Sequence, residues 1–112
     1  MRRVLFLLAL AACSKGPQAD LQYIKQARSV GAEWALVNEQ ASAGKLTATY
    51  VGSMHQWIRQ QMEAASSALT EADTRYAMEI HALLAQPDDA APEELRAHVA
   101  KLKQIEDDLE SA

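Results

Sequence analysis

Apolar side chains recur at intervals of three and four residues along most of this chain, and such spacing predicts helices rather than strands. Only three Pro and four Gly occur in 112 residues, so long stretches contain no residue that breaks a helix. The composition therefore favours an all-α domain with a core built largely from small side chains. The first apolar stripe consists of Tyr23, Ala27, Val30, Trp34, Val37 and Ala41.

Two further stripes follow, and together the three predict helices over about residues 20–43, 47–86 and 92–110. The second is the longest, because its apolar positions keep a helical period from Val51 to Leu83. Its members are Val51, Met54, Ile58, Met62, Ala65, Leu69, Ala72, Tyr76, Ile80 and Leu83. The third stripe consists of Leu95, Val99, Leu102, Ile105 and Leu109.

Residues that favour helix ends separate these segments. Asp20 is expected to cap the first helix, and Gly44 is expected to end it, because glycine tolerates the left-handed backbone conformation. Pro87 cannot continue the second helix. Pro92 suits the first turn of the third, where two glutamates follow it.

Short connections make neighbouring helices antiparallel, and two arrangements remain open. In the favoured one, two antiparallel hairpins share a long, straight central helix. In the other, that helix bends near Ser66 and the chain forms a compact three-helix bundle. Both place Trp34 opposite Trp57, where the two rings are expected to fill the core of the first hairpin.

The amino-terminal residues have the pattern of a secretory signal. Arg2 and Arg3 precede nine uninterrupted apolar residues, 4–12, a run too short to span a bilayer. Leu10-Ala11-Ala12-Cys13 resembles the lipobox of bacterial lipoproteins. The resemblance implies a diacylglycerol thioether on Cys13, cleavage before it, and an acyl chain on the new amine.

These features divide the chain into a signal peptide (1–12), a lipidated Cys with a short tether (13–19) and a helical domain (20–112). Cys13 is the only Cys, so no internal disulfide is possible. The expected location is the cell envelope, facing the periplasm. Ser14 at the next position favours the outer over the inner membrane in the enteric sorting scheme. No cofactor is expected besides the covalent lipid on Cys13.

The murein lipoprotein family is also small, helical and lipidated, but the similarity ends there. That family ends in a Lys joined to peptidoglycan, whereas this chain ends Glu110-Ser111-Ala112. The breaks at Pro87 and Pro92 also exclude one continuous coiled coil. The resemblance therefore assigns no function to residues 20–112.

Residues that could carry chemistry are few. His81 and His98 are expected at the same level of the second hairpin, with Glu94 one turn before His98. Zinc needs three or four converging ligands, so the two histidines are candidates without a complete site. His55 is interpreted as a residue at the core boundary. The sequence contains no nucleophile elbow and no phosphate-binding loop, and an enzyme is not expected.

Charge is unevenly distributed along the chain. Residues 13–60 carry five basic and three acidic side chains, and residues 61–112 carry four basic and twelve acidic ones, so their net charges are +2 and −8. This acidity argues against a nucleic-acid partner. The acidic second hairpin is expected to point away from anionic headgroups.

Three functions are therefore considered. The leading one is a non-catalytic lipoprotein, anchored through Cys13, that acts as an accessory, tether or interaction module for another envelope protein or for itself. One alternative is a small-ligand or metal-binding lipoprotein centred on His81 and His98. The other is an inhibitor whose acidic hairpin blocks a basic envelope protein.

Overall fold

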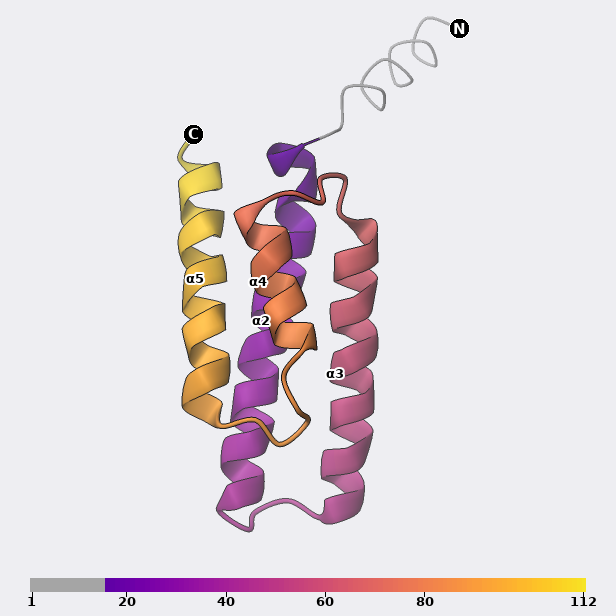
Figure 1. Cartoon of the computed structure of the whole chain (residues 1–112). Coiled ribbons are helices and arrows are strands. Elements are labelled where there is room, and N and C mark those ends of the chain that lie inside the picture. The colour runs from indigo at the N-terminus through magenta and orange to yellow at the C-terminus, as the bar shows by residue number, and fades with distance from the viewer. Residues whose placement is uncertain (1–15) are drawn as a thin grey trace, which may run out of the picture.

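The computed structural model describes residues 16–112, which form four helices and no strand (Figure 1). The all-α prediction is confirmed, whereas the predicted count of three helices is wrong. Residues 1–15, with the expected signal peptide and Cys13, lie outside the described residues. No helix between residues 16 and 112 is long and apolar enough to cross a bilayer. The helices are α2 (Pro17–Ser42), α3 (Ala48–Ala68), α4 (Arg75–Leu84) and α5 (Pro92–Glu110).

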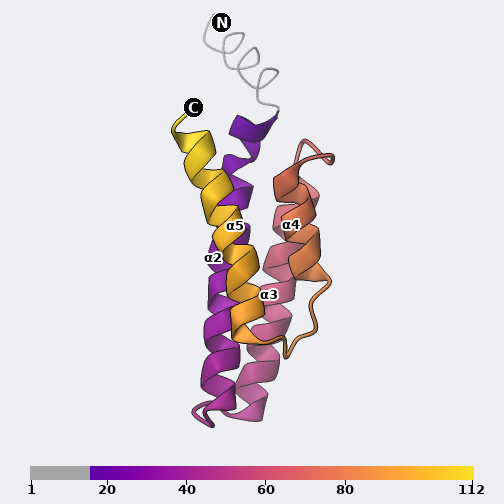
Figure 2. The same ribbon diagram turned by 60° about the vertical axis from the view of Figure 1, so that its left-hand side comes forward.

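Successive helices run antiparallel, and α2 contacts all three other helices (Figures 1 and 2). It packs against α3 and α5 along most of its length, while the short α4 lies between α3 and α5 and touches α2 as well. The predicted straight central helix over residues 47–86 is wrong, because the chain reverses between Ala68 and Arg75. This break follows closely on the expected bend near Ser66, but it yields a fourth helix rather than a three-helix bundle.

Local capping explains where the break falls. Leu69 adopts an extended conformation (φ −61°, ψ 136°), and the Thr74 hydroxyl caps α4 by accepting the amide of Ala77 at 3.1 Å. The amides of Thr70 and Glu71 lose their helical partners, and the Asp20 carboxylate accepts both. Asp20, which lies about fifty residues away in the sequence, thus provides the hydrogen-bond acceptors that these two amides need outside a helix.

Asp20 is therefore not a helix cap, and the predicted start of the first helix is wrong. α2 begins three residues earlier, with Gly16 at the cap position and Pro17 in the first turn. Proline suits this position because its missing N–H would have no helical partner there. Asp20 consequently lies inside the first turn, where it is fully buried.

The other predicted helix ends are confirmed. Gly44 is left-handed (φ 72°), and the amides of Gly44 and Lys45 bond to the carbonyls of Ala41 and Gln40, both at 3.0 Å. At the opposite end of the chain, α5 begins at Pro92 as expected.

The core largely follows the predicted stripes, with two corrections: Ala72 of the second stripe is exposed in the α3–α4 connection, and Trp57 is not a core residue. Trp34 is buried, with only 1% of its surface exposed, as expected. Trp57 is 43% exposed, so the prediction that it fills the hairpin core is wrong. Adjacent residues on a helix point about 100° apart, so the fully buried Ile58 excludes its neighbour from the same face. The buried apolar residues are Ile24, Ala27, Val30, Trp34, Ala35, Val37, Ile58, Met62, Ala65, Tyr76, Ala77, Ile80, Leu83, Ala90, Leu95, Leu102 and Ile105.

Small residues let the helices approach closely. A Cβ atom at Gly31 would lie 2.8 Å from Val99 Cγ2 and 3.5 Å from Leu83 Cδ1. α2 can therefore keep its present distance from α5 only because residue 31 has no side chain.

Candidate functional site

A polar cluster closes the end of the bundle at which α2 begins. Asp20 accepts hydrogen bonds from the Thr70 amide at 2.8 Å, the Glu71 amide at 3.2 Å and the Tyr76 hydroxyl at 2.7 Å. The amide of Gly16 donates to the Thr70 hydroxyl oxygen at 2.9 Å. These bonds tie the start of α2 to the α3–α4 connection.

The same contacts change the acidity of both partners. Burial disfavours the charged form of Asp20, but the hydrogen bonds from Tyr76, Thr70 and Glu71 outweigh burial and lower the pKa of its carboxyl. Burial and the hydrogen bond to Asp20 raise the pKa of Tyr76 to about 12. The pair is therefore a carboxylate and a neutral phenol near neutral pH, which is a structural arrangement rather than an acid–base couple.

A second cluster fixes the loop between α4 and α5. The Trp34 indole N–H and the Asn38 amide each donate to the carbonyl of Asp88 at 2.9 Å. The Arg59 guanidinium lies 5.2 Å from the centroid of the Trp34 ring and bonds to the Asp88 carboxylate at 2.6 Å. Half-buried His55 contacts Asn38 Oδ1 at 2.7 Å, which agrees with its expected place at the core boundary.

Ion pairs attach α5 to α2. Arg28 Nε lies 2.5 Å from Glu106 Oε1, and Glu106 is almost completely buried. Two exposed pairs accompany it: Lys25 with Glu110 at 2.8 Å and Arg96 with Glu39 at 3.1 Å.

A carboxylate cluster lies near the end of α5. Oxygen atoms of Glu106, Asp107 and Glu110 lie within 4.8 Å of one another, a spacing that could hold a cation. Each carboxylate, however, already faces a basic side chain: Lys103 lies 3.0 Å from Asp107, and Arg28 and Lys25 reach the other two. The cluster is therefore already largely compensated in charge.

The acidic end of α5 is not remote from the start of the domain. The Gln18 side-chain amide donates to the carbonyl of Leu109 at 2.9 Å, and Figure 1 shows the C-terminus at the end of the bundle where α2 begins. The end of α5, which belongs to the acidic second hairpin, thus lies beside the start of α2, whereas the orientation of this hairpin relative to anionic headgroups stays a prediction.

The two histidines lie in different environments. His98 Nδ1 contacts Glu79 Oε2 at 2.8 Å, and Lys101 lies 3.5 Å from the other oxygen of Glu79. His81 is exposed on α4, and Glu94 is exposed near the start of α5. Among residues 16–112, neither histidine belongs to a group of three converging metal-ligand side chains.

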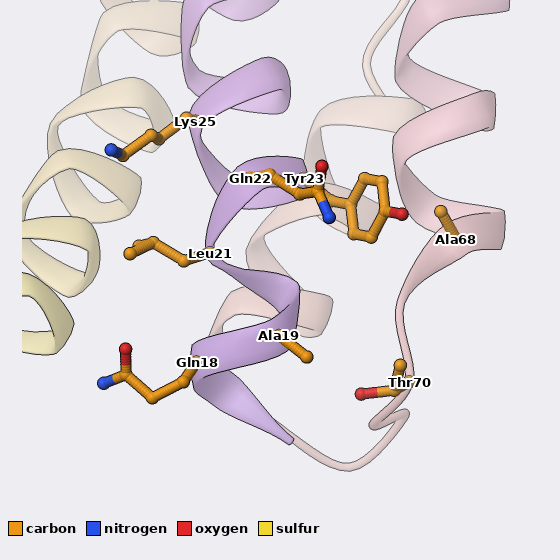
Figure 3. A pocket seen from close by; sticks show the side chains of 8 residues that line it. All are labelled: Gln18, Ala19, Leu21, Gln22, Tyr23, Lys25, Ala68 and Thr70. Atoms are coloured by element: carbon orange, nitrogen blue, oxygen red, sulfur yellow. The ribbon is translucent and has the colours of Figure 1, made fainter. Parts of the chain in front are cut away.

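A surface hollow of about 530 Å³ lies over the first turns of α2. Its lining side chains diverge: Figure 3 shows Gln18, Leu21 and Lys25 on the side of α5, with Ala19 and Tyr23 on the side of α3. Side chains that point apart do not converge on one ligand. The hollow is therefore a shallow surface feature rather than a formed binding site.

The outer face of α3 is the most distinctive surface. Tyr50 and Trp57 are 50% and 43% exposed and lie two turns apart on one side of the helix. α3 contains only two charged side chains, Arg59 and Glu63. Sequence reasoning missed this face, although a second stripe of uncharged residues at helical spacing was present to indicate it.

No protein family model, curated protein or solved structure matches this chain. Its function must therefore be argued from its own residues.

Proposed function

We propose that this chain is a non-catalytic lipoprotein of the bacterial envelope, anchored through Cys13, whose helical domain contacts another envelope protein or a second copy of itself. The observation that carries the interaction part is the outward face of α3, where two large aromatic side chains are exposed without charged neighbours in their row. Monomeric proteins expose isolated apolar residues freely, but large aromatic side chains are enriched at protein–protein contact surfaces.

The anchor part is supported by residues 1–13. A basic start, nine apolar residues and Leu-Ala-Ala before the only Cys form one continuous pattern. Two or three acyl chains on Cys13 would hold the domain at the membrane essentially permanently, whereas one chain binds reversibly. Pro17 begins α2 only four residues after Cys13, so the bundle would sit close to the bilayer surface.

Metabolic labelling with a palmitate analogue tests the anchor. We expect the wild-type protein to incorporate the label and to fractionate with membranes, and Cys13→Ser to lose both properties. Mass spectrometry should find residue 13 at the new amino terminus, carrying lipid. An intact leader with an unmodified thiol at position 13 would contradict the anchor.

A photo-crosslinking residue tests the interaction in the same cells. Placed at position 57, it should give a discrete protein adduct, whereas at Ala97, an exposed residue of α5, it should give none. Equal adducts from both positions would mean that α3 has no special role.

A further inference from the structure

α3 carries a second helical stripe that the fold leaves uncovered. Its members are spaced 3-4-3-4-3, which keeps them on one line along the helix. All six are exposed and none is charged, although 23% of the chain consists of charged residues. This outer row consists of Tyr50, Ser53, Trp57, Gln60, Ala64 and Ser67.

The row has the form of a helix–helix contact surface. In heptad terms Tyr50, Trp57 and Ala64 occupy one position, and Ser53, Gln60 and Ser67 occupy the position three residues later. Two aromatic side chains can act as knobs, and the short side chains of the row leave room for close approach. The polar members of the row alternate with Tyr50, Trp57 and Ala64, and a polar side chain at such a position can fix the register of two helices.

Charge favours a second copy of this chain as the occupant. α5 holds nine charged side chains with a net charge of −3, so two copies would repel each other through it. α3 has no net charge, because Arg59 and Glu63 balance. The outer row is therefore the place where two such acidic domains can meet without like-charge contact.

We infer that the outer row of α3 binds the same row of a second copy, with the two helices parallel and in register. The parallel direction rests on the proposed function: Cys13 precedes Gly16, the cap residue of α2, by three positions, a reach of about 10 Å. Both copies then present the same end of the bundle to one membrane. Trp57 faces Trp57 of the partner, and Ser53, Gln60 and Ser67 face their own counterparts.

The contact is small, and the membrane compensates for its size. A row on one helix of 21 residues buries less than the roughly 800 Å² per partner that a standard interface provides. Anchoring in one bilayer raises the effective concentration of the two copies, so a weak contact is sufficient there.

Disulfide trapping in the full-length protein, in the membranes of the cells that make it, tests this inference. Ser53→Cys alone and Ser67→Cys alone should each form a disulfide-linked dimer under mild oxidation. Ala97→Cys, on the exposed face of α5, is the matched control and should remain monomeric. Adding Trp57→Glu or, separately, Ala64→Glu should reduce trapping at Ser53→Cys by about tenfold, since a central anchor is lost or a charge is placed in the contact.

The outcomes separate the alternatives. Trapping at neither position, or equally at Ala97→Cys, overturns the inference. Cells that produce both the Ser53→Cys and the Ala64→Cys variant test the direction of the helices. A disulfide that forms only between these two variants indicates antiparallel helices and overturns the parallel arrangement. Maleimide labelling of the wild-type protein tests the anchor separately from the dimer. A thiol at Cys13 that reacts with maleimide refutes the anchor. A Cys13 that does not react, together with no disulfide trapping, refutes only the dimer.

Discussion

α3 and α5 flank α2 and have similar lengths of 21 and 19 residues, but their surfaces differ. α5 contains nine charged side chains and makes three ion pairs with α2. α3 contains two charged side chains, and it is linked to α2 by neutral polar groups: the Gln26 amide donates to the carbonyl of Gln61 at 3.2 Å, and His55 contacts Asn38 Oδ1 at 2.7 Å. α5 thus uses much of its polarity to hold the bundle, whereas no side chain in the outer row of α3 forms a hydrogen bond or ion pair with another segment of residues 16–112.

Replacing the two tryptophans separately should give the largest difference in stability between a buried side chain of α2 and a side chain in the outer row of α3. Trp34→Ala removes a buried ring and its hydrogen bond to Asp88, and we expect the free energy of unfolding to fall by about 3–5 kcal/mol. Trp57→Ala, on the outer row of α3, should cost less than about 1 kcal/mol. Urea unfolding followed by circular dichroism measures both, and a large loss for Trp57→Ala would show that the outer face of α3 stabilises the monomer.

The connection that ends α3 depends on Asp20. Asp20→Ala leaves the amides of Thr70 and Glu71 and the hydroxyl of Tyr76 without their acceptor, and we expect a loss of about 2–3 kcal/mol. The loss should appear in urea unfolding, and hydrogen exchange should quicken first at residues 69–76. Glu71→Ala, which keeps the backbone bonds, is the matched control and should change stability by less than about 0.5 kcal/mol.

The acidity of this pair predicts a pH dependence with a definite sign. The folded pKa of Asp20 is lowered, so its contribution is present above its ordinary pKa of 3.8 and is lost as the pH falls through the folded value. The folded pKa of Tyr76 is raised to about 12, so its contribution is complete below pH 10 and is lost as the pH rises towards 12. In a plot of the free energy of unfolding against pH, Asp20→Asn should reduce the decrease at acidic pH. Tyr76→Phe should reduce the decrease at alkaline pH.

The sequence was sufficient for the helices whose ends are encoded locally. Gly44 and Pro92 act within their own turn of the chain, so both ends were predicted correctly. The end of α3 was missed because the apolar period continues through Leu69 to Tyr76, while the acceptor for the freed amides, Asp20, lies about fifty residues away. A helix period cannot reveal a hydrogen bond between distant segments.

The candidate surface was missed for a related reason. The antiparallel pairing of the first hairpin sets Trp57 opposite Trp34 and so assigns it to the core, and Tyr50 belongs to none of the predicted stripes. A helix can carry two stripes, and only the packing of α2 decides that Ile58 faces inward. The absence of charge in the outer row was readable in the sequence and would have indicated the second stripe.

The attachment of α5 should depend on one ion pair rather than on all three. Arg28→Met keeps the aliphatic stem but leaves buried Glu106 with only Lys103, whose Nζ lies 3.7 Å away, and we expect a loss of about 1–2 kcal/mol. Lys25→Met removes an exposed pair and should cost less than about 0.5 kcal/mol, with no effect left at high salt. Equal losses measured by urea unfolding would mean that burial of Glu106 is not what fastens α5.

Two glycines provide the finest comparison of the contacts of α2 with those of α3. Gly31→Ala should lower the unfolding free energy by up to about 1 kcal/mol, because overpacking against Val99 outweighs the gain in helix propensity. Gly52→Ala places a methyl group in open space on α3 and should raise the unfolding free energy by about 0.5–1 kcal/mol. Val99→Ala should lessen the penalty of Gly31→Ala in a double-mutant cycle, because it removes the atom 2.8 Å from the new methyl group. If both glycine variants were stabilising and no coupling appeared, α2 and α5 would have room to separate, and close packing could not be the reason for glycine at position 31.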